Sequence, residues 1–70
     1  MRSVAFEGET IRLGQLLKLA GLADSGGGAK QLLADGDVTV NGEPEDRRGR
    51  QLHAGDTVAV GGEAVTLVAK

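Results

Sequence analysis

The spacing of apolar residues along the chain changes from a helical period to a strand period. After Thr10, apolar side chains recur at i, i+3, i+4 and i+7, at Leu13, Leu16, Leu17 and Ala20. This spacing is typical of a helix that buries one side. Gly21 follows at the place where a left-handed residue commonly ends a helix. The pattern therefore predicts a helix that begins after Thr10 and ends before Gly21.

A second helix is predicted from Ser25, a favourable N-cap residue, to Asp35. Its apolar positions again follow the helical spacing, at Ala29, Leu32 and Leu33. The first turn consists of three consecutive glycines at positions 26–28, and each of them costs a helix up to about 1 kcal/mol relative to alanine. We therefore expect another interaction to hold this turn in place.

From Asp37 onward the apolar period becomes two, which is typical of β-strands. Asn41-Gly42 predicts a tight hairpin turn, and Pro44 beyond it suits an edge strand. Further short strands are predicted at residues 2–6, 58–60 and 65–68. This order of elements predicts a single small α+β domain that spans residues 1–70.

The composition excludes several classes of protein. Glycine supplies twelve of the 70 residues, more than twice its usual share of ~7%. The content of aliphatic residues is nevertheless high enough to predict that the chain folds. The absence of cysteine excludes disulfide frameworks and thiolate zinc sites, and the net charge of −2 excludes a uniformly basic surface. With Phe6 as the only aromatic residue, no surface for stacking successive bases is expected. No apolar run suits a signal peptide or a membrane span, so we expect a cytoplasmic protein.

The start of the second helix is a candidate phosphate site. Helix N-terminal N–H groups attract anions, and three glycines leave the backbone open to close approach. Lys30 and Gln31 lie within the first two turns and could extend such a contact. The alternative is a flexible, poorly capped helix start with no ligand.

A second candidate is the charged segment 45–50, which is predicted to be an exposed loop. Three of the eight basic residues lie here within four positions, at Arg47, Arg48 and Arg50. Planar guanidinium groups suit phosphate contacts. Three acidic neighbours, Glu43, Glu45 and Asp46, leave the alternative that the loop neutralises its own charge.

An ordered set of residues resembles the S4 RNA-binding domain family. The set comprises Leu13, Leu16, Gly21-Leu22, Ser25, Ala29, Leu32-Leu33, Gly36, Val38, Val40-Asn41-Gly42 and Gly55-Asp56. Segments 13–18, 40–45 and 47–50 are similar to the small stand-alone bacterial members of that family. The resemblance covers approximately residues 10–60, and its specificity lies in the combination of motifs.

This resemblance implies a fold and a function. The implied fold is the αL motif, in which two short helices pack on a small bent antiparallel sheet of short strands. The implied partner is structured RNA of the ribosomal or transfer RNA type, with a ribosomal or other protein as a further partner. Together with the start of the second helix and the arginine segment, the resemblance gives the following RNA-binding candidates: Arg12, Ser25, Gly26, Lys30, Gln31, Asn41, Gly42, Arg47, Arg48 and Arg50. Gly26 stands where the family usually has a basic residue, a departure that fits the stand-alone members.

Catalysis is the least supported class of function. Asp24-Ser25-Gly26-Gly27 is similar to the nucleophile region of trypsin-like proteases, but those enzymes are far longer and His53 is the sole histidine here. We expect His53 to be a surface turn residue, and we expect no metal, cofactor or small-molecule substrate. The alternative function is a protein-interaction domain on the same fold, which the net acidity and Gly26 motivate. A ubiquitin-like sulfur carrier would need a C-terminal Gly-Gly where Ala69-Lys70 stands.

Overall fold

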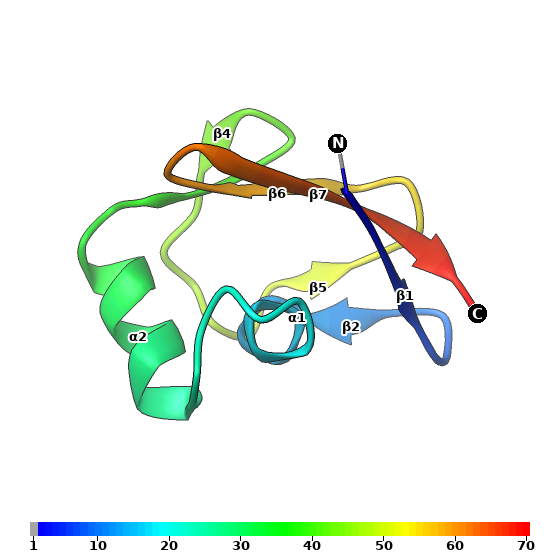
Figure 1. The fold of residues 1–70 in the computed structure, drawn as a ribbon, viewed down its shortest axis with the longest axis horizontal. Helices are drawn as coiled ribbons and strands as arrows, with labels where there is room; N and C mark the ends of the chain where they lie inside the picture. The colour runs from blue at the N-terminus through cyan, green and yellow to red at the C-terminus, as the bar shows by residue number, and fades with distance from the viewer. Residues whose placement is uncertain (1) are drawn as a thin grey trace.

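The computed structural model describes residues 2–70, so Met1 of the predicted domain lies outside the described residues. Within these residues two helices and seven strands follow one another (Figure 1). They are β1 (Arg2–Phe6), β2 (Ile11–Arg12), α1 (Leu13–Leu19), α2 (Gly26–Ala34), β3 (Val38–Val40), β4 (Glu43–Pro44), β5 (Gln51–Leu52), β6 (Thr57–Val60) and β7 (Glu63–Ala69). The predicted α+β class is confirmed.

The main sheet has five strands in the order β1-β7-β6-β3-β4. Strands joined by short turns pair antiparallel, as predicted, but β1 runs parallel to β7 with Val4 opposite Leu67. The sheet is therefore mixed rather than wholly antiparallel. A hairpin turn dictates antiparallel pairing, whereas β1 and β7 lie at opposite ends of the chain and no turn constrains their direction. A second, two-stranded sheet pairs β2 with β5.

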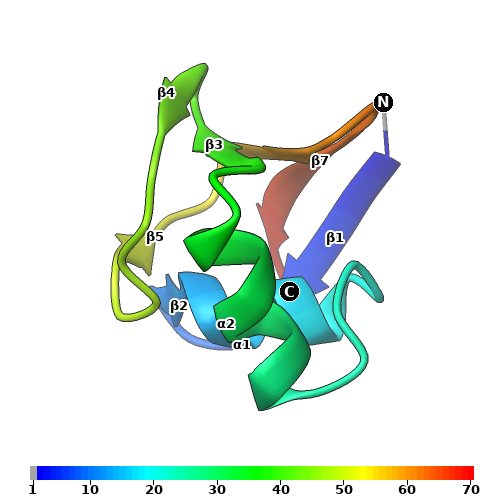
Figure 2. The ribbon, with the colours of Figure 1, turned by 90° about the vertical axis from the view of Figure 1, so that its left-hand side faces the viewer.

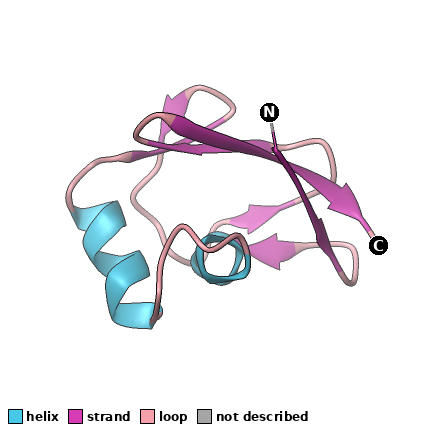
Figure 3. Ribbon diagram, viewed as in Figure 1, coloured by secondary structure: helices cyan, strands magenta, loops and turns pink. Residues whose placement is uncertain are grey.

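Both helices lie on one side of the five-stranded sheet (Figure 3). Figure 2 shows α2 in front of α1 in the turned view. Among the described residues, the core between these layers consists of fifteen buried apolar residues: Val4, Phe6, Leu13, Leu16, Leu17, Ala20, Ala23, Ala29, Leu33, Val38, Val40, Leu52, Val58, Val65 and Leu67. Every position of the predicted apolar face of α1 belongs to it. Neither helix is long and apolar enough to cross a membrane, a statement that applies to residues 2–70.

The two ends of α1 differ in how well the sequence predicted them. The helix begins at Leu13 rather than directly after Thr10, because Ile11 and Arg12 pair with β5 and Arg12 stays extended, with ψ 146°. The end is confirmed: Gly21 has φ +74°, and the N–H of Leu22 donates to the carbonyl of Leu17 over 2.9 Å. This is the glycine-terminated cap in which a left-handed residue satisfies the last carbonyls.

The turn of the β3–β4 hairpin also follows the prediction. Asn41 and Gly42 have φ +53° and +86°, and they join β3 to β4 where Val40 lies opposite Glu43. Pro44 lies on β4, an edge strand, where its missing N–H costs no bond inside the sheet.

Candidate nucleic-acid interface

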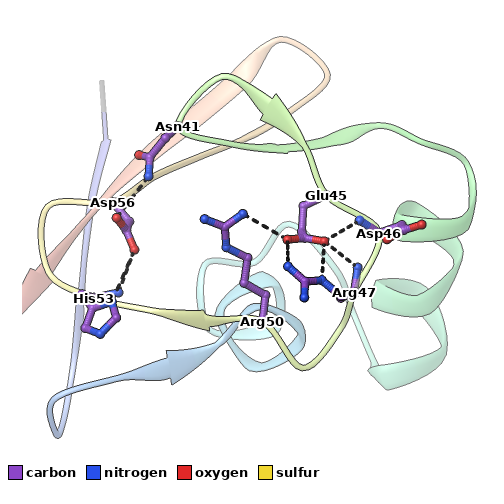
Figure 4. A network of polar contacts seen from close by, with 7 residues as sticks. All are labelled: Asn41, Glu45, Asp46, Arg47, Arg50, His53 and Asp56. Atoms are coloured by element: carbon purple, nitrogen blue, oxygen red, sulfur yellow. Dashed lines mark hydrogen bonds and ion pairs between the residues drawn. The ribbon is translucent and has the colours of Figure 1, made fainter.

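Glu45 corrects the prediction that residues 45–50 form a wholly exposed loop. Its side chain is only 5% exposed, and its carboxylate accepts five hydrogen bonds (Figure 4). The donors are the backbone N–H groups of Asp46 and Arg47, two guanidinium nitrogens of Arg47, and one guanidinium nitrogen of Arg50, all at 3.0–3.2 Å. These donors, above all the Arg47 guanidinium, lower the pKa of Glu45 to about 2. Two of the three arginines thus share one internal carboxylate, which offsets part of their charge.

Arg48 is placed differently, because the backbone of the loop is bonded to the start of α1. The carbonyl of Arg48 accepts from the N–H of Gly14 at 3.0 Å, and the carbonyl of Arg50 accepts from the N–H of Leu13 at 2.8 Å. The first N–H groups of a helix lack partners within it. Loop carbonyls supply those partners here, since the N-cap Arg12 makes no side-chain cap bond.

Gly14 is a site residue that the sequence analysis missed. A Cβ atom at this position would lie 2.5 Å from Cγ and 3.2 Å from Cδ of Arg48. The side chain of Arg48 therefore packs directly on the helix backbone. A glycine inside an otherwise leucine-rich helix, where it costs about 1 kcal/mol relative to alanine, is the signal that could have indicated this close approach.

A cleft of about 360 Å³ lies between the start of α1, the start of α2 and the arginine loop. Its lining residues are Arg12, Gly14, Gln15, Lys18, Gly26, Ala29, Arg48 and Gly49. Three of these are cationic and none is acidic. The cleft therefore has a positive lining in a chain whose formal net charge is −2.

The N-terminus of α2 forms one wall of this cleft. Ser25 is its N-cap, as predicted, and its hydroxyl accepts from the N–H of Gly28 over 3.1 Å. The N–H groups of Gly26 and Gly27 belong to the first turn and have no acceptor within the helix. Gly26 lines the cleft, and nothing lies within 4 Å of the place where its Cβ would stand.

The eight basic residues divide into two equal groups. Four have internal partners: Arg2 donates to the carbonyl of Ala20, Arg47 and Arg50 pair with Glu45, and Lys70 lies 3.6 Å from Glu7. Within residues 2–70 the side chains of the other four make neither an ion pair nor a hydrogen bond to the protein, and they are Arg12, Lys18, Lys30 and Arg48.

These four unpaired cations lie in one region of the surface. Arg12, Lys18 and Arg48 line the cleft, and Lys30 lines a neighbouring cavity of about 400 Å³ that also contains Arg48. Asp46 lines the second cavity as well, so the lining of the first carries the larger positive charge. Among the described residues, the cationic side chains without a hydrogen bond or ion pair thus line these two neighbouring cavities.

Other predicted site residues lie outside this cleft. The amide of Asn41 donates to Asp56 at 3.1 Å and accepts from the N–H of Thr57 at 2.9 Å, so it joins two turns. Gly42 lies beside it in the hairpin turn, and Gln31 bonds to Asp35 one helical turn on. An RNA contact at these three residues stays a prediction. His53 is exposed, as expected, and its backbone N–H bonds to Asp56 and lowers the pKa of that carboxyl.

Two helices packed on a mixed sheet, with segments 13–18 and 47–50 joined at a positive cleft, define a small α+β domain of the S4 type. Residues 4–68 match the model of the S4 domain family. The chain therefore belongs to this family, and the resemblance seen in the sequence is confirmed.

Three curated relatives support this membership, and two of them are of similar length. RlbA of Bacillus subtilis (strain 168), provisionally named a ribosome maturation protein, is 49% identical over 59 residues, which cover 84% of this chain and 83% of RlbA. YbcJ of Escherichia coli (strain K12), provisionally named an RNA-binding protein, is 42% identical over 59 residues, which cover 84% of each chain. The small ribosomal subunit protein uS4 of Akkermansia muciniphila is 35% identical over 54 residues, 77% of this chain but 27% of that protein.

Proposed function

We propose that this protein is a non-catalytic RNA-binding domain that holds structured RNA of the ribosomal or transfer RNA type through its phosphates. One observation carries the proposal: of the four cations without internal partners within residues 2–70, three line the cleft between α1, α2 and the arginine loop, and Lys30 lines the cavity beside it. The names of its relatives, which refer to ribosome maturation, RNA binding and the small ribosomal subunit, support this choice of partner. Such a ligand would place the protein in the bacterial cytoplasm.

The chemistry of the cleft suits a phosphate better than a base. Guanidinium groups of Arg12 and Arg48 and the ammonium group of Lys18 supply charge-assisted donors, and the N–H groups at the start of α2 add weaker ones. The only aromatic side chain, Phe6, is 2% exposed in the core, so no ring is offered for base stacking. We therefore expect recognition of RNA shape and backbone rather than of base sequence.

A fluorescence anisotropy titration in rising salt tests the proposal. With four phosphate contacts, the plot of log affinity against log salt has an expected slope of about −3 to −4. The variant Arg12→Ala/Lys18→Ala/Lys30→Ala/Arg48→Ala is expected to lose most of this affinity and slope. Lys70→Ala, which removes a cation paired with Glu7 instead, is the control and keeps both.

Two results contradict the proposal. One is the absence of saturable binding to ribosomal or transfer RNA at low salt. The other is unchanged affinity in the fourfold variant. Partners that stay bound after nuclease treatment, together with either result, would favour the protein-interaction alternative.

A further inference from the structure

We propose that Glu45 is a positioning residue that selects which arginine of the loop meets RNA: it retains Arg47 and Arg50 and leaves Arg48 in the cleft. The inference rests on the proposed function, because it concerns the same site. It adds a role for a buried carboxylate that lies beside the cleft without lining it.

Glu45 uses both of its oxygens. Oε2 accepts from the N–H groups of Asp46 and Arg47 and from Nε of Arg47, while Oε1 accepts from Arg47 Nη2 and Arg50 Nη1. Figure 4 shows the two guanidinium groups converging on this one carboxylate. A charge with 5% exposure depends on its partners, because water cannot replace them. A phosphate that recruited Arg47 or Arg50 would have to break these bonds.

The carboxylate also offsets the charge that the two arginines present. Arg47 remains 74% exposed and Arg50 33% exposed, and Arg48 is exposed as well, so exposure alone does not separate Arg47 from Arg48 as the RNA contact. Pairing with Glu45 weakens the attraction of both for a phosphate, whereas Arg48 makes no ion pair within residues 2–70. Of the two exposed arginines, Arg47 and Arg48, it is therefore Arg48 whose charge is available.

Glu45 and α1 hold the loop from two sides. On one side the carboxylate binds the N–H groups of residues 46 and 47, and on the other the N–H groups of Leu13 and Gly14 bind the carbonyls of Arg50 and Arg48. Arg48 lies between these two attachments, with its side chain against Gly14. Loss of the carboxylate removes one attachment and frees two guanidinium groups in the same step.

Single arginine variants test the inference, since Arg47→Ala, Arg48→Ala and Arg50→Ala each remove one positive charge. Arg48→Ala is expected to weaken binding to structured RNA roughly tenfold and to reduce the salt slope by about 0.7–0.9. Arg47→Ala and Arg50→Ala are expected to change affinity by less than about twofold, within the range of a solvent-screened pair.

The order of the three arginines by their contribution to RNA affinity is expected to change in Glu45→Gln. This variant keeps the shape of the side chain and removes its charge. Arg47 and Arg50 then become available, so the salt slope steepens by about 0.7–0.9 for each new phosphate contact. Arg47→Ala in that background is expected to cost as much affinity as Arg48→Ala. A residue with a purely structural role would lower thermal stability without changing the slope or the ranking. Glu43→Gln, an equal charge change on exposed β4, is the control.

The outcomes separate this inference from the proposed function. Equal losses for Arg47→Ala and Arg48→Ala in the wild-type chain would overturn the role of Glu45 while RNA binding stands. No binding by the wild-type chain would overturn the proposed function first. If circular dichroism shows that Glu45→Gln does not fold, the three arginine variants alone decide the question.

Discussion

The side chain of Arg48 occupies the space that a side chain at Gly14 would need: a Cβ atom at position 14 would lie 2.5 Å from Cγ of Arg48. Real Cβ atoms do not approach other carbons this closely, so any other residue at position 14 must displace the arginine. The same pair is joined through the backbone, where the N–H of Gly14 donates to the carbonyl of Arg48 at 3.0 Å. This contact couples the first turn of α1 to the conformation of the arginine loop.

Gly14→Ala is therefore expected to weaken RNA binding about as much as Arg48→Ala, roughly tenfold for a lost charge-assisted contact. Stability should change by no more than about 1 kcal/mol, because alanine's better helix propensity offsets the displaced side chain. Anisotropy titrations and thermal unfolding measure the two effects. Combining Gly14→Ala with Arg48→Ala should add no further loss, since both act on one side chain.

Gly62→Ala is the matched control for this experiment. Position 62 lies in the turn between β6 and β7, has no positive φ, and has nothing within 4 Å of its Cβ position. The RNA affinity of Gly62→Ala should equal that of the wild type. Full affinity in Gly14→Ala would show that the position of Arg48 on the helix is unimportant.

Gly26 and Gly27 give a pair of variants that separate stability from binding. Both positions accept a methyl group, since Gly26 has no neighbour within 4 Å and Gly27 only Ser25 Oγ at 3.8 Å. Each change to alanine is expected to stabilise the protein by about 0.4–1 kcal/mol. Only Gly26 lines the cleft, so Gly26→Ala should weaken RNA binding several-fold while Gly27→Ala leaves it unchanged.

Thermal unfolding and the same RNA titration check this pair. Equal affinities of the two variants would mean that the backbone at the start of α2 is not approached by RNA. The three glycines would then remain an unexplained cost to the helix, which was the alternative left open by the sequence.

Local signals explain which parts of the fold could be predicted from the sequence. The apolar faces of α1 and α2 and the positive φ at Gly21 and Asn41 depend on residues a few positions apart. The direction of β1 could not be predicted, because its partner β7 is almost the whole chain away. The start of α1 was predicted too early for a similar reason, since the pairing of Ile11 with Leu52 competes with helix formation.

The candidate site was predicted in part. The sequence named Ser25, Gly26 and the three arginines as RNA-binding candidates, but it treated the three arginines as equivalent. Their difference depends on a carboxylate that folds back within the loop and on carbonyls that meet the N–H groups of α1. Neither set of hydrogen bonds produces a periodic pattern of residues in the sequence. Only the position of Gly14 in an apolar helix hinted that something packs there.

The low pKa of Glu45 predicts how stability responds to acid. The carboxyl has a pKa of about 2 in the folded protein against an ordinary 4.5, so the folded state binds fewer protons between these values. Glu45 therefore contributes stability that is fully present above about pH 4.5 and is lost as the pH falls toward 2. Urea midpoints measured from pH 2.5 to 7 should fall steeply below pH 4.5 in the wild type.

Glu45→Gln should flatten this fall and be less stable than the wild type at pH 7. Asp56, whose pKa is also lowered, contributes in the same direction, so Asp56→Asn serves as a comparison that retains the part due to Glu45. Parallel curves for the wild type and Glu45→Gln would contradict the assignment of the acid-sensitive step to this carboxylate.

Variants of Asn41 test whether the side chain of this predicted site residue has a role inside the protein or contacts RNA. Its left-handed backbone, φ +53°, and its two side-chain hydrogen bonds, to Asp56 and to the N–H of Thr57, are all lost or strained in Asn41→Ala. The expected cost is about 2–3 kcal/mol of unfolding free energy. Asn41→Gly should recover about 1 kcal/mol, because glycine adopts positive φ freely.

Both variants should bind RNA with wild-type affinity at a temperature where thermal unfolding shows them fully folded, because the amide of Asn41 is occupied inside the protein and lies outside the cleft. The titration is best done well below the lower of the two melting temperatures, with Lys70→Ala as the reference for an unrelated surface change. A similar loss of affinity in folded Asn41→Ala and Asn41→Gly would instead show that the side chain leaves Asp56 and Thr57 to contact RNA, and the interface would then extend from the cleft to the hairpin turn.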